Sequence, residues 1–432
     1  MKNHNYSNIN AKLESITANT LVIGSDIAKE YNYARAQDWR RIEMTEKPLV
    51  YRNDAQGYAL LIGWIENLKS KYGKTEVMFG VEPSGSYWKP LFEYLGRKNN
   101  IRLVMVNPFH VKLSKELEDN SPSKNDGKDS RLIAGMINDG KYCDMMVQEG
   151  LYAELRCLMQ HRFTVAAQQA QVKCRINQWI EEYFPEMQDA IGKWTGKTGM
   201  AILKTMPLPV ETIRHSVDEI VAKWREQGMK KISRKRAVKL QTAAKESVGI
   251  SYGLTAAKMK LQNLIEQYEM YMKQLAGIML QADLIMDELP ESKLMLSIKG
   301  VGKIAVASFI AEVGNIRKYD SWEQISKLAG LNLVSMSSGQ HRGCTVIAKR
   351  GRSMLRAALF RAVITLVAQN SEFKEMHQHF TKRTKNPLKK KQSIVALMNK
   401  LIRIIFGLVK NNRMYDGKKL QTDRSTMINQ AA

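Results

Sequence analysis

Three apolar runs in the N-terminal third of the chain predict buried strands. They cover residues 21–28, 76–82 and 101–106, and polar or turn residues bound each of them. Amphipathic helical patterns over residues 59–71 and 87–98 lie between these runs. Strands that alternate with helices predict a largely parallel α/β sheet, and ligands of such sheets bind beyond the carboxyl ends of the strands.

From Glu149 onward, the pattern of apolar positions becomes helical. An apolar stripe with steps of three and four residues, or their multiples, runs from Leu155 to Tyr183. A second stripe, from Leu261 to Ile278, has the three-four alternation of a coiled coil. This alternation leaves two interpretations open: core packing within one helical domain, and a seam between protomers.

The charge balance favours a polyanionic partner. The 432 residues include 67 Lys and Arg against 42 Asp and Glu, which gives a formal net charge of +25. Nucleic acid fits such a surface, although a soluble protein with a basic surface is the simpler alternative. No apolar run reaches the ~18 residues that a membrane-spanning helix needs, and residues 1–18 lack the apolar segment of a secretory signal. We therefore expect a cytoplasmic protein without a membrane segment.

Four carboxylates form a candidate metal site. Asp26 and Glu82 each close an apolar run, and Asp126 and Asp129 share one face if a helix begins there. Oxygen ligands favour Mg²⁺ or Mn²⁺, and the four scattered cysteines show no zinc spacing. Two such ions would stabilise in-line displacement at a phosphodiester. The alternative is that the strand-end acids are turn formers or caps, and that the Asp pair is a solvated helix start.

The C-terminal third contains two candidate phosphate-binding elements. Gly300-Val301-Gly302-Lys303 lies between two helical patterns and looks like a helix-hairpin-helix, although a tight turn between packed helices would have the same pattern. A Ser- and Gly-rich loop over residues 335–343 is followed by a basic segment, and both are suited to a phosphodiester. The basic residues in and after this loop are His341, Arg342, Lys349, Arg350, Arg352 and Arg356. A nucleophilic serine in the loop would need activation, and no Ser-His-Asp order is evident.

Together these motifs resemble the RNA-guided DEDD insertion-sequence transposases (insertion-sequence type one-ten), whose relatives include site-specific DNA invertases. The resemblance covers roughly residues 21–137 and 294–408. It implies a RuvC-like (RNase H-like) N-terminal domain with Asp26, Glu82, Asp126 and Asp129 as catalytic acids and metal ligands. It makes Ser338 of the Ser338-Gly339 pair the nucleophile, with Ser337 as the fallback.

The sequence departs from the family pattern at a few positions. Asn125 and Ser130 replace the usual Thr and Ala of the motif around the last two acids, and Ser25 stands where an apolar residue is common. The Pro that often follows the Gly-Leu element before Ser338 is missing. None of these departures removes a carboxylate or the serine.

The family resemblance implies a recombinase with a covalent phosphoserine intermediate. An Mg²⁺ (or Mn²⁺) site would assist it, at composite sites of a dimer or tetramer. A noncoding bridge RNA would pair with double-stranded donor and target DNA, in a prokaryotic cytoplasm and at the nucleoid during activity. The residues expected to bind nucleic acid are Lys124, Gly300, Gly302, Lys303, Arg342, Lys349, Arg350, Arg352 and Arg356.

We expect five segments along the chain. They are a polar extension (1–17), the RuvC-like domain (18–145), a helical or coiled-coil insert (146–290), a mostly helical C-terminal transposase domain (291–410) and a tail (411–432). Three other functions stay open: a RuvC-like nuclease that uses water, an invertase without an RNA guide, and a nonenzymatic nucleic-acid-binding protein.

Overall fold

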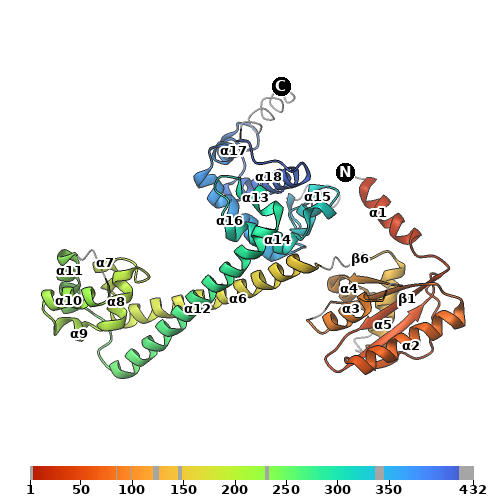
Figure 1. The fold of residues 1–432 in the computed structure, drawn as a ribbon, viewed down its shortest axis with the longest axis horizontal. Coiled ribbons are helices and arrows are strands. Elements are labelled where there is room, and N and C mark those ends of the chain that lie inside the picture. The colour runs from red at the N-terminus through yellow and green to blue at the C-terminus, as the bar shows by residue number, and fades with distance from the viewer. Residues whose placement is uncertain are drawn as a thin grey trace. The chain divides into compact units, whose positions relative to one another are not determined.

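The structure is a computed structural model that divides the chain into two compact units, Met1–Val147 and Gln148–Ala432 (Figure 1). It describes residues 3–83, 85–98, 100–119, 126–144, 148–228, 233–335 and 345–417. The first unit is a mixed α/β domain and the second consists mostly of helices. The predicted insert and the predicted C-terminal domain both belong to the second unit.

The first unit is built on a six-stranded sheet with the order β3-β2-β1-β4-β5-β6. The three predicted strands form its parallel centre, whereas β2, β3 and β6 pair antiparallel with their neighbours. The sheet is thus mixed, and the prediction of a largely parallel sheet was wrong. The strands are β1 (Thr20–Asp26), β2 (Tyr31–Gln37), β3 (Leu49–Arg52), β4 (Glu76–Val81), β5 (Ile101–Val106) and β6 (Tyr142–Asp144).

Helices cover both faces of this sheet. α2 (Ala55–Tyr72) and α3 (Trp88–Gly96) pack on one face, where Leu21, Ile23 and Phe79 belong to their core. α4 (Pro108–Asp119) and α5 (Asp126–Asn138) pack on the other face, against Val22 and Met78. Because side chains alternate between the faces of a strand, the neighbours Leu21 and Val22 serve two different cores. α1 (Asn3–Glu14) precedes the sheet.

Two long helices organise the second unit. α6 (Gly150–Tyr183) and α12 (Leu254–Glu288) lie side by side (Figure 1). They run antiparallel, because the start of α6 shares a core with the end of α12, and the end of α6 shares another core with the start of α12. Leu261 and Leu264 of the coiled-coil stripe are buried within the chain, which favours intramolecular core packing for this part of the stripe.

The end of α6 and the start of α12 form a core with five short helices. This core contains three fully buried tryptophans, Trp179, Trp194 and Trp224. We call this part, residues 172–271, the tip. Its short helices are α7 (Met187–Ile191), α8 (Lys197–Thr205), α9 (Pro209–Ile213), α10 (Val217–Glu226) and α11 (Arg234–Lys245).

The other end of the helix pair packs into the C-terminal core. α18 (Lys390–Lys410) is long and apolar enough to cross a membrane by length and composition, but its buried face, including Leu397 and Leu401, packs in this core. Such a face is expected of a core helix. The remaining elements are α13 (Pro290–Leu296), α14 (Lys303–Val313), the 3-10 helix η1 (Ile316–Lys318), α15 (Trp322–Leu328), β7 (Leu333–Ser335), β8 (Thr345–Ile347), α16 (Ser353–Gln369), α17 (Ser371–Lys382) and α18 (Lys390–Lys410).

Candidate active site

Two predicted acids lie next to each other at the carboxyl edge of the sheet. Asp26 is the last residue of β1, and Glu82 directly follows β4. β1 and β4 are parallel neighbours in which Ser25 pairs with Val81, so the next position on each strand is an acid. Both carboxylates are half-buried. The pairing register therefore confirms the prediction that the strand ends bring these two acids together.

A glycine precedes each acid by two positions and admits α5 to the same face of the sheet. A Cβ at Gly24 would lie closer than 3.0 Å to the backbone atoms Ser130 O and Ala134 N. A Cβ at Gly80 would lie as close to the side chain of Ile137. Because residues two apart on a strand share a face, Asp26 and Glu82 point to the face that α5 covers. These glycines were not predicted, although the repeated Gly-x-acid pattern at two strand ends is visible in the sequence.

The direction of α5 places its first turn at the same edge. Ser130 packs at Gly24, near the end of β1, whereas Asn138 donates a hydrogen bond to Gln37 Oε1 at 3.2 Å. Gln37 pairs with Val22 near the start of β1, so α5 runs from the carboxyl edge of the sheet towards the opposite edge. Asp129, which is 8% exposed, therefore lies in the turn nearest to Asp26.

The acid set fits a hard divalent cation by the chemistry of its carboxylate oxygens. No group of three or more His, Cys, Asp or Glu residues close enough to hold a metal ion occurs among the described residues. α5 begins at Asp126, but the side chain of this fourth acid lies outside the described residues. Carboxylate oxygens on one sheet edge remain the donor type that Mg²⁺ and Mn²⁺ take.

Ser25, where the family usually has an apolar residue, is fully buried behind Asp26. Its hydroxyl lies 2.8 Å from the Tyr51 hydroxyl and donates a hydrogen bond to Tyr33 O at 3.0 Å. Burial raises the pKa of Tyr51, against the effect of the Ser25 hydrogen bond, and the negative charge of Asp26 raises it further. Tyr51 is therefore a neutral hydroxyl at neutral pH, and the polar residue at position 25 has its hydrogen bonds satisfied.

In the second unit, the predicted glycine hairpin joins α13 to α14. Gly300 has a φ of 98°, a conformation that favours glycine, and a Cβ at Gly302 would meet open space. Lys303, the first residue of α14, pairs with Asp283 at 2.8 Å. This hydrogen bond and the charge of Asp283 raise the pKa of Lys303. The Lys303 ammonium is thus already paired within the chain, and its binding to nucleic acid stays a prediction.

Ser338 and Ser337 fall in the segment 336–344, which lies outside the described residues, as do His341 and Arg342. Lys124 lies outside them as well. The segment joins β7 to β8, which pair antiparallel from Leu333 with Ile347 to Ser335 with Thr345. The structure therefore describes the base of the serine loop and leaves the position of the candidate nucleophile open.

The Gly-Leu element, Gly330-Leu331, is hydrogen-bonded to the segment from Lys349 to Arg356 that follows this hairpin, and we call the two together the brace. The backbone amide of Lys349 donates to Gly330 O at 3.0 Å, and that of Arg352 donates to Leu328 O at 2.7 Å. The Arg356 guanidinium donates to Ala329 O at 2.8 Å. Gly351 allows this approach, because a Cβ there would lie closer than 3.0 Å to Leu328 O.

The predicted basic residues of this segment divide into two kinds. The Arg352 guanidinium donates to Glu312 O and lies 4.0 Å from the Glu312 carboxylate, and burial together with the charge of Arg156 lowers the pKa of Arg352. Arg352 and Arg356 therefore support the fold of the brace. Lys349 and Arg350 are exposed, and their contact with nucleic acid stays a prediction.

Models of two transposase families match separate stretches of the chain. A model of DEDD-type transposases of insertion sequence IS110 matches residues 23–185, and a model described as transposase IS116/IS110/IS902 family matches residues 292–378. Pilin gene-inverting proteins of Moraxella bovis and Moraxella lacunata are each 32% identical to the chain over 129 residues. Each alignment covers 29% of this chain and 38% of the relative, so the chain spans well under half the length of these curated relatives.

Proposed function

Because this chain belongs to the IS110 family of transposases, we propose that it cuts and rejoins DNA with an acidic site in its first unit and a serine in its second. The observation that carries the proposal is the common sheet edge of Asp26, Glu82 and the first turn of α5. This edge is where parallel strands of an α/β sheet present their ligands. We also infer that the first unit is a RuvC-like domain.

Asp26, Glu82 and Asp129, together with Asp126, would hold Mg²⁺ or Mn²⁺. A divalent cation bound there would stabilise the negative charge that develops on phosphodiester oxygens. The side chains contribute by their position: the two strand-end acids are fixed by the sheet, and Asp129 is fixed by the contact of α5 with Gly24. This preorganisation is what electrostatic catalysis requires.

Ser338 is the proposed nucleophile. Its oxygen forms a bond to a DNA phosphorus atom while the bond from phosphorus to the leaving deoxyribose oxygen breaks, and the serine proton is transferred to that oxygen. Attack by a hydroxyl of another strand on the phosphoserine reverses the step and restores the serine. The overall exchange needs no oxidant or external energy source, since one phosphodiester bond replaces another.

We propose double-stranded donor and target DNA as substrates, a noncoding guide RNA as the partner that selects them, and a dimer or tetramer with composite sites. The net charge of +25 suits a protein that contacts many phosphates. The site of action would be the cytoplasm, at the nucleoid.

A covalent-adduct assay tests this function. Incubated with labelled DNA and Mg²⁺, the unsubstituted protein should form a protein–DNA adduct that survives denaturant. Ser338→Ala should abolish it, whereas Ser371→Ala, at an exposed position on α17, should leave it unchanged. Adduct formation that persists in Ser338→Ala and is lost in Ser337→Ala would move the nucleophile by one residue. Cleavage without any adduct would instead support a nuclease that uses water.

The acidic site is tested separately with Asp26→Asn, Glu82→Gln and Asp129→Asn. Each should lower the cleavage rate by at least about 100-fold, because each removes one ligand charge from the site. Glu66→Gln is a matched control, since Glu66 is exposed on α2 and pairs with Lys69 at the surface. Cleavage that is undiminished in all three variants would remove the acidic site from the mechanism and favour a nonenzymatic DNA-binding role.

The similarity to pilin gene-inverting proteins favours DNA inversion as a second candidate function. A plasmid with two candidate sites in inverted orientation separates the two functions. Inversion by protein freed of RNA would support the invertase. Strand exchange that appears only when copurifying RNA is added back would support guided transposition.

A further inference from the structure

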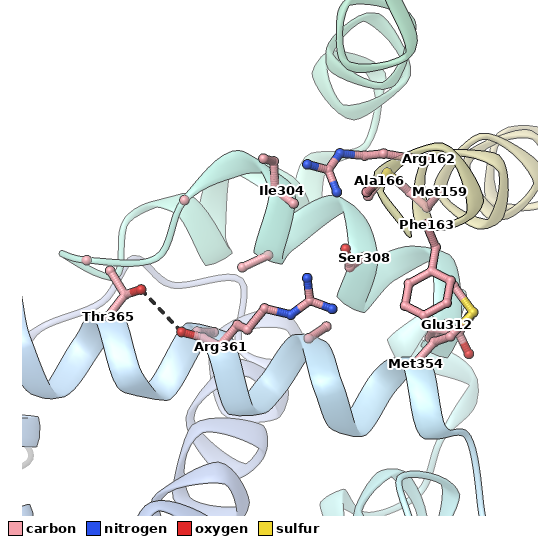
Figure 2. A pocket seen from close by; sticks show the side chains of 15 residues that line it. Met159, Arg162, Phe163, Ala166, Ile304, Ser308, Glu312, Met354, Arg361 and Thr365 are labelled. Atoms are coloured by element: carbon pink, nitrogen blue, oxygen red, sulfur yellow. Dashed lines mark hydrogen bonds between the residues drawn. The ribbon is translucent and has the colours of Figure 1, made fainter. Parts of the chain in front are cut away.

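A pocket in the second unit is lined by none of the predicted acids or serines. It has a volume of about 260 Å³ and lies between α6, α14 and α16, and Gly300 and Gly302 of the hairpin also line it. Figure 2 shows side chains from all three helices directed into it. Of its lining residues, the predictions singled out only the two glycines, because the others lie on three helices that are far apart in the sequence.

Two arginines face each other across this pocket. Arg162 comes from α6 and Arg361 from α16, and Figure 2 shows their guanidinium groups pointing into the same space, in front of Ser308 on α14. No ion pair of either arginine occurs among the described residues. The Nε atom of Arg162 is buried without a hydrogen-bond partner in that same part of the chain.

The two positive charges oppose each other. Burial lowers the pKa of Arg162, and the charge of Arg361 lowers it further. Glu312 lies at the far side of the pocket, but its carboxylate faces Arg352 at 4.0 Å. An anion between Arg162 and Arg361 would offset both their repulsion and the partial desolvation of the half-buried Arg162 guanidinium.

Most of the remaining lining is apolar, and part of it is exposed to solvent. Phe163 is 45% exposed and Ile304 is 44% exposed, and both line it together with Met159, Ala166 and Met354. An exposed aromatic ring beside guanidinium groups is the combination that single-stranded nucleic acid uses, with the base stacked and the phosphate paired. The pocket lies just below the ~300 Å³ at which pockets for drug-sized molecules begin, which suits one nucleotide unit.

We infer that this pocket holds one unpaired nucleotide of a nucleic acid strand, with its phosphate between Arg162 and Arg361 and its base against Phe163 and the apolar wall. The inference rests on the proposed function, since strand exchange and guide pairing both pass through unpaired nucleotides. DNA and RNA strands share the phosphate and the base, so the experiment includes both.

Binding is measured by fluorescence anisotropy with the full chain and labelled 12-nucleotide strands of DNA and RNA, and with a DNA duplex of the same length. Arg361→Ala and Arg162→Ala should each weaken single-strand binding about tenfold and reduce the slope of log affinity against log salt by about 0.7. Arg361→Lys keeps the charge but loses the planar guanidinium, so its single-strand affinity should lie between those of the unsubstituted protein and Arg361→Ala. Arg175→Gln, at an exposed position further along α6, controls for general loss of charge.

The base contact is tested with a strand that carries one abasic site. The intact protein should bind the best-placed abasic strand about tenfold more weakly than the intact strand, and Phe163→Ala should erase this difference. Leu280→Ala, at an exposed apolar position on α12, should preserve it. Circular dichroism and thermal melts verify that each variant is folded.

Several results would overturn the inference. Among them are equal loss of affinity in Arg175→Gln, unchanged salt slopes in both pocket arginine variants, or an abasic penalty that survives Phe163→Ala. Duplex binding that depends on the pocket as strongly as single-strand binding would overturn it as well. Because the assay measures binding without cleavage, it keeps its meaning if Ser338 or the acids prove inactive.

Discussion

At the scale of single residues, Asp38 illustrates how the fold keeps a carboxylate charged beneath its surface. The side chain of Asp38 is 7% exposed. It accepts hydrogen bonds from the Ile42 amide at 2.9 Å, the Arg40 amide at 2.8 Å and the Arg40 guanidinium at 3.0 Å. Burial raises the pKa of Asp38, but these hydrogen bonds outweigh it, and the pKa is lowered overall.

A lowered pKa makes stability depend on pH in a defined direction. The contribution of Asp38 is fully present above its unfolded pKa of about 3.9 and is lost as the pH falls through its folded value. Asp38→Asn should therefore lower the stability of the first unit by about 1.5 kcal/mol at pH 7, with a smaller deficit at pH 3. Urea unfolding at both pH values measures this. An equal deficit at both would show that charge is not the cause, and Glu93→Gln, at an exposed position, should show no deficit.

At the scale of elements, the contact of α5 with the sheet determines the geometry of the candidate active site. The contact at Gly24 is made by helix backbone, whereas the contact at Gly80 is made by the side chains of Ile137 and Val104. A backbone atom moves only with its helix, but a side chain can change its rotamer. The two glycines should therefore differ in how well they tolerate a methyl group.

We predict that Gly24→Ala destabilises the protein by about 3 kcal/mol and Gly80→Ala by about 1 kcal/mol, the upper and lower ends of overpacking. Gly24→Ala should also reduce cleavage by folded protein, since it shifts the turn that carries Asp129. Denaturant unfolding and single-turnover cleavage measure the two effects. Similar unfolding energies for the two variants would contradict the backbone contact.

The sequence predicted the elements whose pattern is local. β1, β4 and β5 are apolar runs, and all three were predicted. β2 was missed because its buried positions include Asn32, which is fully buried and accepts a hydrogen bond from the Ala28 amide, so the strand lacks an apolar run. α2 begins at Ala55 rather than at residue 59, because Asp54 caps it.

The candidate site was predictable to a similar extent. Strand-end acids can be recognised from one segment each, and the pairing of β1 with β4 then brings Asp26 beside Glu82. The direction in which α5 crosses the sheet depends on contacts between distant segments. The two glycines were the only indication of it in the sequence. The arginine pair of the pocket could not be predicted from the sequence, since a single basic residue on an amphipathic helix usually lies on the solvent-exposed face.

At the scale of the whole molecule, the two candidate halves of the chemistry belong to different units. The acids lie in Met1–Val147, and the serine loop belongs to Gln148–Ala432. Each unit has its own hydrophobic core, which is the condition for independent folding. We therefore expect the proposed function to require both units, and each unit to fold without the other.

We predict that the fragments 1–147 and 148–432 each unfold cooperatively when produced separately. Neither should form a DNA adduct alone, because the first lacks Ser338 and the second lacks the acids. Calorimetry and the adduct assay measure these outcomes. An adduct formed by fragment 148–432 without the acids would contradict the shared chemistry.

The antiparallel pair of α6 and α12 has a consequence for how this protein can diverge. The core of the tip and the C-terminal core share these two helices but, among the described residues, no buried core residue. A substitution that changes the packing of one core should therefore leave the packing of the other core unchanged. We therefore expect related proteins to differ more in the tip than in the C-terminal core.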